Sequence, residues 1–175
     1  MSAAAAIVRT RSGPERDAIR EMVAEFFDFM RVRYPDMLAE IDDYILQQDI
    51  AGQLADFDRY FLPPHGECFL GLHEGAPAGM VMIRPAGDGA CEMNRMYVRP
   101  AARGTGLGRA LCAAVIAEAR ALGYRTVLLD ALYRHEEALP LYRAMGFRDY
   151  SDPALFKADD RRVVHMRLDF DGGPA

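Results

Sequence analysis

A glycine-rich turn between an extended segment and a helical one constrains this chain more than any other feature. Residues 92–98, EMNRMYV, have the character of a strand. Pro100 ends that strand because proline lacks the amide donor that a sheet requires. The turn RGTGLG at residues 103–108 then leads directly into apolar residues at helical spacing, beginning with Leu107. The sequence therefore predicts a strand, a turn and a helix N-terminus in immediate succession.

This arrangement predicts an anion site. Backbone N–H groups point outward at a helix N-terminus, and the helix dipole adds partial positive charge there. Glycines in the turn let a phosphate approach the backbone because no Cβ is in the way. Arginines at both ends of the turn can supply countercharge. We expect a diphosphate-bearing cofactor to be bound by Arg103, Gly104, Thr105, Gly106, Leu107, Gly108 and Arg109.

The glycine spacing indicates which cofactor. A dinucleotide fold needs G-x-G-x-x-G, but Arg109 occupies the third glycine position, and the Gly-Lys-Ser/Thr of a P-loop is absent. The pattern Arg103-x-x-Gly106-x-Gly108 instead resembles the pyrophosphate loop of the GNAT superfamily, the acyl-CoA-dependent N-acetyltransferases. An ordinary strand–helix turn is the alternative interpretation of so short a motif.

A second segment supports the same resemblance. Residues 126–129 predict a buried strand, and residues 136–145 predict a helix that ends at Gly146. The block Ala138-x-x-x-Tyr142-x-x-x-Gly146-Phe147 resembles the signature that follows the phosphate loop in GNAT proteins. The resemblance covers residues 67–150 well and the N-terminal 60 residues only loosely.

The expected architecture is α+β, an α/β three-layer GNAT fold in one domain spanning residues 1–175. Its core covers residues 5–170, and a disordered tail covers 171–175. The resemblance implies a central mixed, mostly antiparallel sheet whose fourth and fifth strands splay apart between helices. The slot between them would hold the pantetheine arm of acetyl-CoA. The backbone of Met96, Tyr97 and Val98 would line it.

Further elements follow from local patterns. A helix over residues 18–32 begins near Pro14 and ends at Tyr34-Pro35, because the residue before proline leaves helical geometry. The remaining expected elements are short helices over 42–46 and 53–61 split by Gly52, strands over 7–10, 68–72, 79–83 and 162–169, and a hairpin turn at 87–89.

Composition excludes several classes of function. The chain has 175 residues, 51% of them hydrophobic, which suits one domain with a sizeable core. A net charge of −5 argues against a nucleic-acid partner, and no apolar run is long enough for a membrane span. Its N-terminus lacks the basic segment of a secretory signal. Three cysteines without CxxC suggest neither disulfides nor a metal site and fit the cytoplasm. A homodimer is left open.

The resemblance also supplies candidate catalytic residues. Tyr142 matches the tyrosine that sits beside the CoA sulfur, where a protonated phenol could donate to the departing thiolate. Packing of this tyrosine between helix and strand is the alternative. His135 stands where many members have an asparagine that binds pantetheine, and an imidazole can make a similar hydrogen bond. His65 and His165 are expected to be structural or surface groups.

The catalytic base has two candidates. Asp130, twelve residues before Tyr142, matches an acidic position in several GNAT N-acetyltransferases but is shorter than their glutamate, so a water would bridge it to the amine. Holding the next loop is its alternative role. The second candidate for the base is Glu92. Strand alternation predicts two faces for this strand, one with Glu92, Asn94, Met96 and Val98 and the other with Met93, Arg95 and Tyr97.

The expected function is transfer of an acetyl group from acetyl-CoA to a primary amine by direct attack in a ternary complex. A catalytically silent acyl-CoA-binding module of the same fold is the alternative. Use of a longer acyl-CoA is left open. The acceptor cannot be identified from the sequence. Acidic residues between positions 36 and 58 could attract a cationic amine or form a solvated surface.

Overall fold

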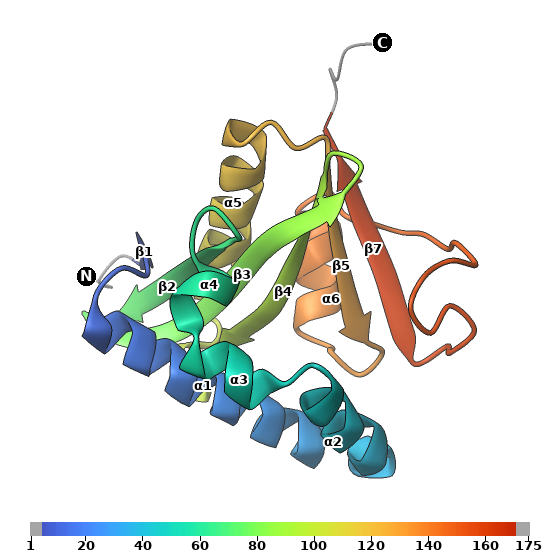
Figure 1. Ribbon diagram of the computed structural model, residues 1–175, viewed down its shortest axis with the longest axis horizontal. Helices are drawn as coiled ribbons and strands as arrows, with labels where there is room; N and C mark the ends of the chain where they lie inside the picture. The colour runs from blue at the N-terminus through green and yellow to red at the C-terminus, as the bar shows by residue number, and fades with distance from the viewer. Residues whose placement is uncertain (1–4, 171–175) are drawn as a thin grey trace.

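A seven-stranded mixed sheet forms the middle of the molecule in the computed structural model, which describes residues 5–170 (Figure 1). The strand order is β1-β2-β3-β4-β5-β7-β6, and only the β4–β5 pair is parallel. The strands are β1 (Ala6–Arg9), β2 (Glu67–His73), β3 (Ala76–Gly87), β4 (Ala90–Val98), β5 (Thr126–Leu132), β6 (Arg148–Asp149) and β7 (Val163–Asp169). The α+β architecture is confirmed. The expected disordered tail lies outside the described residues.

Helices cover both faces of the sheet. They are α1 (Gly13–Arg33), α2 (Leu38–Gln47), α3 (Ile50–Ala55), α4 (Phe57–Phe61), α5 (Leu107–Ala121) and α6 (Ala138–Ala144). Two separate hydrophobic cores result: one under α1–α4 and the other under α5 and α6. Neighbouring residues of β3 show the alternation, because Met82 belongs to the first core and Val81 to the second.

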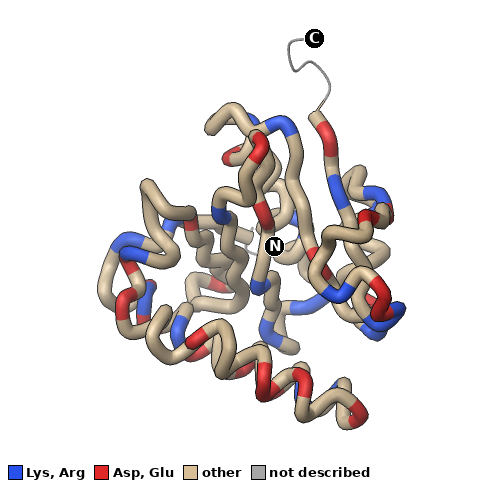
Figure 2. The backbone as a smooth tube through the Cα atoms, turned by 45° about the vertical axis from the view of Figure 1, so that its right-hand side comes forward, with Lys and Arg blue, Asp and Glu red and all other residues tan. Residues whose placement is uncertain are grey.

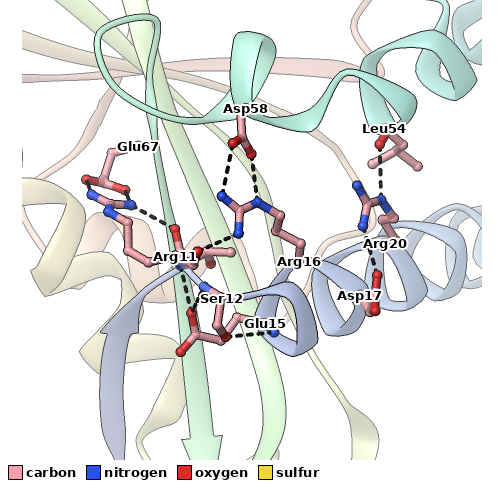
Figure 3. A network of polar contacts seen from close by, with 10 residues as sticks. Arg11, Ser12, Glu15, Arg16, Asp17, Arg20, Leu54, Asp58 and Glu67 are labelled. Atoms are coloured by element: carbon pink, nitrogen blue, oxygen red, sulfur yellow. Dashed lines mark hydrogen bonds and ion pairs between the residues drawn. The ribbon is translucent and has the colours of Figure 1, made fainter.

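Helix α1 is defined by local signals at both ends. Ser12 and Glu15 form a capping box that satisfies backbone donors of the first turn (Figure 3). The helix ends at Tyr34, before Pro35, as predicted. Figure 3 also shows Arg16 of α1 bound to Asp58 of α4, with Nε and Oδ1 2.7 Å apart. This ion pair attaches the helical insert to α1.

The helical insert differs from the prediction. Three helices fill residues 38–61, and Gly52 lies inside α3 instead of dividing two helices. The break between α2 and α3 falls at Asp49, which has a left-handed φ of 47° and accepts a hydrogen bond from the Gly52 amide at 3.2 Å. A second break, at Asp56, separates α3 from α4. The prediction was wrong because an aspartate cap, and not the glycine, sets the helix boundary.

The predicted alternation along β4 is also wrong. Asn94 pairs with Met82, and Tyr97 pairs with Met80. Arg95 and Met96 therefore lie together opposite the one β3 residue that separates those two partners. This β-bulge, with a left-handed φ of 51° at Arg95, reverses the order of the two faces. Met96 and Val98 therefore join Met93 on the α5 face instead of sharing a face with Glu92.

Strands β4 and β5 separate after a short common stretch. Residues 90–92 of β4 pair with residues 126–128 of β5, and beyond them β4 has no β5 partner within residues 5–170. Figure 1 shows the two strands diverging toward their C-terminal ends. The expected splay of the fourth and fifth strands is confirmed.

Candidate active site

A cavity of about 500 Å³ opens where β4 and β5 diverge. It is lined by α1, the end of β4, the glycine-rich turn and the start of α6. Every predicted cofactor-binding residue lines it except Thr105 and Leu107. The lining residues that the sequence did not indicate are Phe26, Phe29, Ala102, Glu137, Ala138 and Leu141.

One end of the cavity is rich in free backbone donors. The first backbone bond of α5 runs from the Ala110 amide to the Gly106 carbonyl at 3.0 Å. Within residues 5–170, no hydrogen bond engages the amides of residues 104–109. Gly104 and Gly106 have φ values of 77° and 90°, a conformation that residues with a Cβ rarely adopt. The turn therefore presents unsatisfied N–H groups and a helix N-terminus to an anion.

The side chains of the turn have separate structural roles. The Thr105 hydroxyl donates to the Ala102 carbonyl at 2.7 Å, and Leu107 is fully buried in the α5 core. Both residues can therefore reach a ligand only through their backbone. Arg103 donates from Nε to the Val98 carbonyl at 3.0 Å, and its guanidinium lies 4.9 Å from the Phe29 ring centre.

The cavity is narrow beside the first turn of α5. A Cβ placed on Gly108 would lie 3.5 Å from Leu141 Cδ2 and 3.7 Å from the side chains of Met96 and Val98. An alanine would fit there in ordinary contact, whereas a longer side chain would extend into the space between α5, β4 and α6. Leu141, Met96 and Val98 therefore border the cavity beside Gly108.

His135 lines the cavity and contacts an unexpected partner. Its Nδ1 lies 2.7 Å from the Tyr34 hydroxyl, and the two rings stack with centres 5.8 Å apart. Burial, aided by the charge of Arg33, lowers the pKa of His135 to about 4. The imidazole is therefore neutral at physiological pH. No sequence signal links these two residues, which lie 101 positions apart.

An ion pair involves another residue of the cavity lining, Glu137. Arg33 at the end of α1 binds both carboxylate oxygens of Glu137, at 2.6 and 2.9 Å. The guanidinium holds the pKa of Glu137 at about 2. Arg33 thereby links α1 to the N-terminus of α6 across the open end of the sheet.

Tyr142 lies in the core under α6 and does not line the cavity, although Leu141 beside it does. Its side chain is 5% exposed, and its ring centre is 6.0 Å from that of Phe147. Burial raises the pKa of the phenol, so Tyr142 holds its proton at neutral pH. No hydrogen bond to its hydroxyl forms among the described residues.

The two candidate bases also lie outside the cavity lining. Asp130 Oδ1 is 2.6 Å from His165 Nδ1, and Glu92 forms an ion pair with Arg84 at 3.0 Å. His165 is buried rather than a surface group, and its Nε2 has no hydrogen-bond partner among residues 5–170. Burial raises the pKa of Tyr150, and the negative charges of Asp130 and Glu92 add to this rise. The two carboxylates therefore share one face of the sheet near that phenol.

Two other kinds of site are absent from the described part of the chain. No group of three or more His, Cys, Asp or Glu side chains there could hold a metal ion. None of the helices within residues 5–170 combines the length and apolar character needed to cross a bilayer.

The comparison with protein families identifies the class to which this fold and cavity belong. The model of the acetyltransferase (GNAT) family matches residues 21–147, most of the chain. The chain belongs to the GNAT family and is an acetyltransferase.

Individual relatives agree with this assignment. An uncharacterised N-acetyltransferase of Schizosaccharomyces pombe is 34% identical over 81% of this chain and 87% of its own length. N-acetylaspartate synthetase of Danio rerio is 30% identical over 66% of this chain. This chain spans only 46% of that relative. The PaiA N-acetyltransferase of Thermoplasma acidophilum, solved with coenzyme A, superposes with a TM-score of 0.70 at 12% identity, covering 96% of this chain and all of that one. That similarity shows a shared fold.

Proposed function

We propose that this acetyltransferase moves the acetyl group of acetyl-CoA onto a primary amine by direct attack in a ternary complex. The observation that carries the proposal is the cavity itself. It begins at unsatisfied amides of a helix N-terminus and continues along the free edge of β4. The Danio rerio relative is named for N-acetylaspartate, which is itself an N-acetylated amine.

In this proposal, acetyl-CoA enters with its pyrophosphate on the amides of residues 104–109, with Arg103 and Arg109 as countercharges. The pantetheine arm follows Met96, Tyr97 and Val98, whose backbone groups face no β5 strand. The neutral imidazole of His135 can hydrogen-bond the pantetheine amides. An amide of the β4 edge would stabilise the oxyanion as the thioester is attacked.

The proposed proton transfers use residues that do not line the cavity. Asp130, through a water, takes the proton from the ammonium group of the acceptor, with Glu92 as the second candidate. The amine nitrogen then attacks the thioester carbon. The tetrahedral intermediate loses its second nitrogen proton to water as it collapses, and the carbon–sulfur bond breaks. Tyr142, which its raised pKa keeps protonated until this step, gives its proton to the departing thiolate. Water must return a proton to Tyr142 before the next cycle.

A catalytically silent acyl-CoA-binding module is the second candidate. The observation that favours it is that Tyr142, Asp130 and Glu92 do not line the cavity. Binding without turnover would then be the whole function. Whether the protein is an enzyme or a silent binding module, we propose that it acts in the reducing cytoplasm, because Cys68, Cys91 and Cys112 are all buried free thiols.

The experiment combines calorimetry with release of the free CoA thiol in the presence of a panel of amines. Gly108→Leu should abolish acetyl-CoA binding because the side chain fills the slot, whereas Gly108→Ala should bind normally. Thermal melting of both variants separates blockage from misfolding. Binding together with amine-dependent thiol release supports the enzyme. Binding of acetyl-CoA without release of the thiol in the presence of any amine supports the silent module. If Gly108→Leu and Gly108→Ala bind acetyl-CoA equally well, the cavity is not the binding site.

A further inference from the structure

Arg95 is a part-buried cation without a carboxylate partner. No Asp or Glu oxygen among the described residues lies within 4.0 Å of its guanidinium. Its Nη2 donates to Gln53 Oε1 at 2.9 Å, and its Nη1 lies 3.7 Å from the Met82 sulfur, a weak acceptor. The guanidinium also lies 5.2 Å from the Phe61 ring centre. These contacts satisfy few of the five N–H donors of an arginine.

The other arginines show how unusual this environment is. In Arg11, Arg33, Arg99 and Arg162, a bound carboxylate raises the pKa of the guanidinium. Burial lowers the pKa of Arg95 instead, and no hydrogen-bonded carboxylate counteracts it. A buried charge without a counterion destabilises a fold unless a ligand supplies the opposite charge.

The backbone at Arg95 is also strained. The residue occupies the β4 bulge with a φ of 51°, a conformation that costs free energy for a side chain other than glycine. The bulge turns the guanidinium toward α3 and α4, the face opposite α5. The next three residues, Met96, Tyr97 and Val98, line the cavity. Arg95 therefore directly precedes the segment along which the pantetheine arm is proposed to lie.

The acids of the helical insert do not neutralise this charge. Asp58 binds Arg16, Asp42 binds Arg31, Asp36 binds Arg134 and Glu40 binds Arg162. Figure 2 shows acidic and basic residues interspersed along the backbone. These acids are therefore paired with arginines of α1 and of the segments before α6 and β7, which favours the solvated surface over an attractive field for a cationic amine.

We propose that Arg95 binds a carboxylate of the acceptor, so that the substrate class is amines that also carry a carboxylate, as amino acids do. This inference rests on the proposed function and specifies its acceptor. The planar fork of a guanidinium matches the two oxygens of a carboxylate, and the weak sulfur contact can be exchanged for one of them. Gln53, buried beside it, orients the guanidinium through its side-chain oxygen.

The test compares L-amino acids with the corresponding L-amino acid amides in the thiol-release assay. Hydrogen bonds to a charged group contribute about 1.5–3 kcal/mol, so kcat/KM for the acids should exceed that for the amides by about 10- to 100-fold. In Arg95→Met this ratio should fall toward one, while Arg95→Lys should keep part of it. The matched control is Arg20→Met, because Arg20 also stacks on an aromatic ring and contacts α3 but is paired with Asp17. Its ratio should stay that of the wild type.

A second measurement does not depend on turnover. Calorimetry on the CoA-loaded protein compares N-acetyl amino acids with N-acetyl amino acid amides, in wild type and in Arg95→Met. If the wild type binds the N-acetyl amino acids and Arg95→Met does not, the proposal for Arg95 is supported. A failure to acetylate any amine would count only against the proposed function. Equal use and equal binding of acids and amides by the wild type overturn the role of Arg95 and leave amine acetylation intact. Thermal melting of each variant shows that the protein is folded.

Discussion

Single residues in this protein take their roles from partners that lie far away in the sequence. Asp130 is bound to His165 of the neighbouring strand, with Oδ1 and Nδ1 2.6 Å apart, and its side chain is still 43% exposed. The carboxylate is thus held in place by an imidazole and stays accessible to water. These features suit a base that acts through water, and they equally suit a structural pair.

The pH dependence of the rate separates these roles. Asp130→Asn should lower kcat/KM and weaken the rise of rate with pH on the acidic limb, because the group that accepts the proton is gone. Glu92→Gln, measured in the same way, tests the rival. His165→Asn should change the profile less than Asp130→Asn if the imidazole only positions the carboxylate. Unaltered profiles in all three variants would mean that neither carboxylate is the base.

Tyr142 allows a prediction that distinguishes chemistry from packing. Tyr142→Phe removes only a hydroxyl that makes no hydrogen bond within the described residues, so the melting temperature should change little. If the phenol protonates the thiolate, kcat should fall by about 10²-fold or more, with acetyl-CoA affinity nearly intact. Stopped assays and calorimetry measure the two quantities. Wild-type turnover would reduce Tyr142 to a core residue.

At the scale of elements, a close contact between β2 and α5 holds the glycine-rich turn in place. Leu107, the first residue of α5, packs directly over Gly71 of β2. A Cβ on Gly71 would lie 2.9 Å from Leu107 Cδ1, closer than carbon atoms approach each other. The absence of a side chain at Gly71 therefore sets how near the start of α5 lies to the sheet.

We expect Gly71→Ala to lower the free energy of unfolding by about 1–3 kcal/mol through overpacking. Leu107→Ala should lower it by about 2–5 kcal/mol by leaving a cavity. The double variant should lose less than the sum, because the new methyl group occupies part of that cavity. Urea unfolding of the four proteins gives this coupling. If the losses of unfolding free energy in the two single variants add up to that of the double variant, the tight contact between Gly71 and Leu107 is contradicted.

At the scale of the whole molecule, Tyr34 and His135 join the helical layer of α1 to the loop before α6 across the open end of the sheet. In the folded protein His135 has a pKa of about 4, below the ordinary value of 6.5. The unfolded chain therefore binds a proton at higher pH than the native protein does. The contribution of His135 to stability is complete above pH 6.5 and is lost as the pH falls toward 4.

The melting temperature of the wild type should accordingly drop between pH 6.5 and pH 4, and this drop should be shallower in His135→Gln. The variant gives up some stability at neutral pH but has no imidazole to protonate. His65→Gln, a substitution in the loop before β2, serves as the control and should keep the wild-type slope. If the melting temperature changes with pH equally in His135→Gln and in the wild type, His135 titrates alike in the folded and the unfolded protein.

The sequence by itself determined the features that depend on neighbouring residues. The strand–turn–helix around Gly106, the start of α1 near Pro14 and its end before Pro35 follow from backbone preferences of a few adjacent residues, and the structure has all three. The same local pattern predicted most of the cavity lining, because the glycine-rich turn and the end of β4 adjoin in the chain.

Only the tertiary structure decided which distant residues meet. The bulge at Arg95 depends on the register of β4 against β3, which reversed the predicted faces. The partners of Asp130 and His135 lie 35 and 101 positions away. Tyr142 was predicted from its motif, yet its burial outside the cavity lining depends on how α6 packs against the sheet. Local preferences act over a few residues, whereas register, burial and charge pairing are settled when the layers pack together.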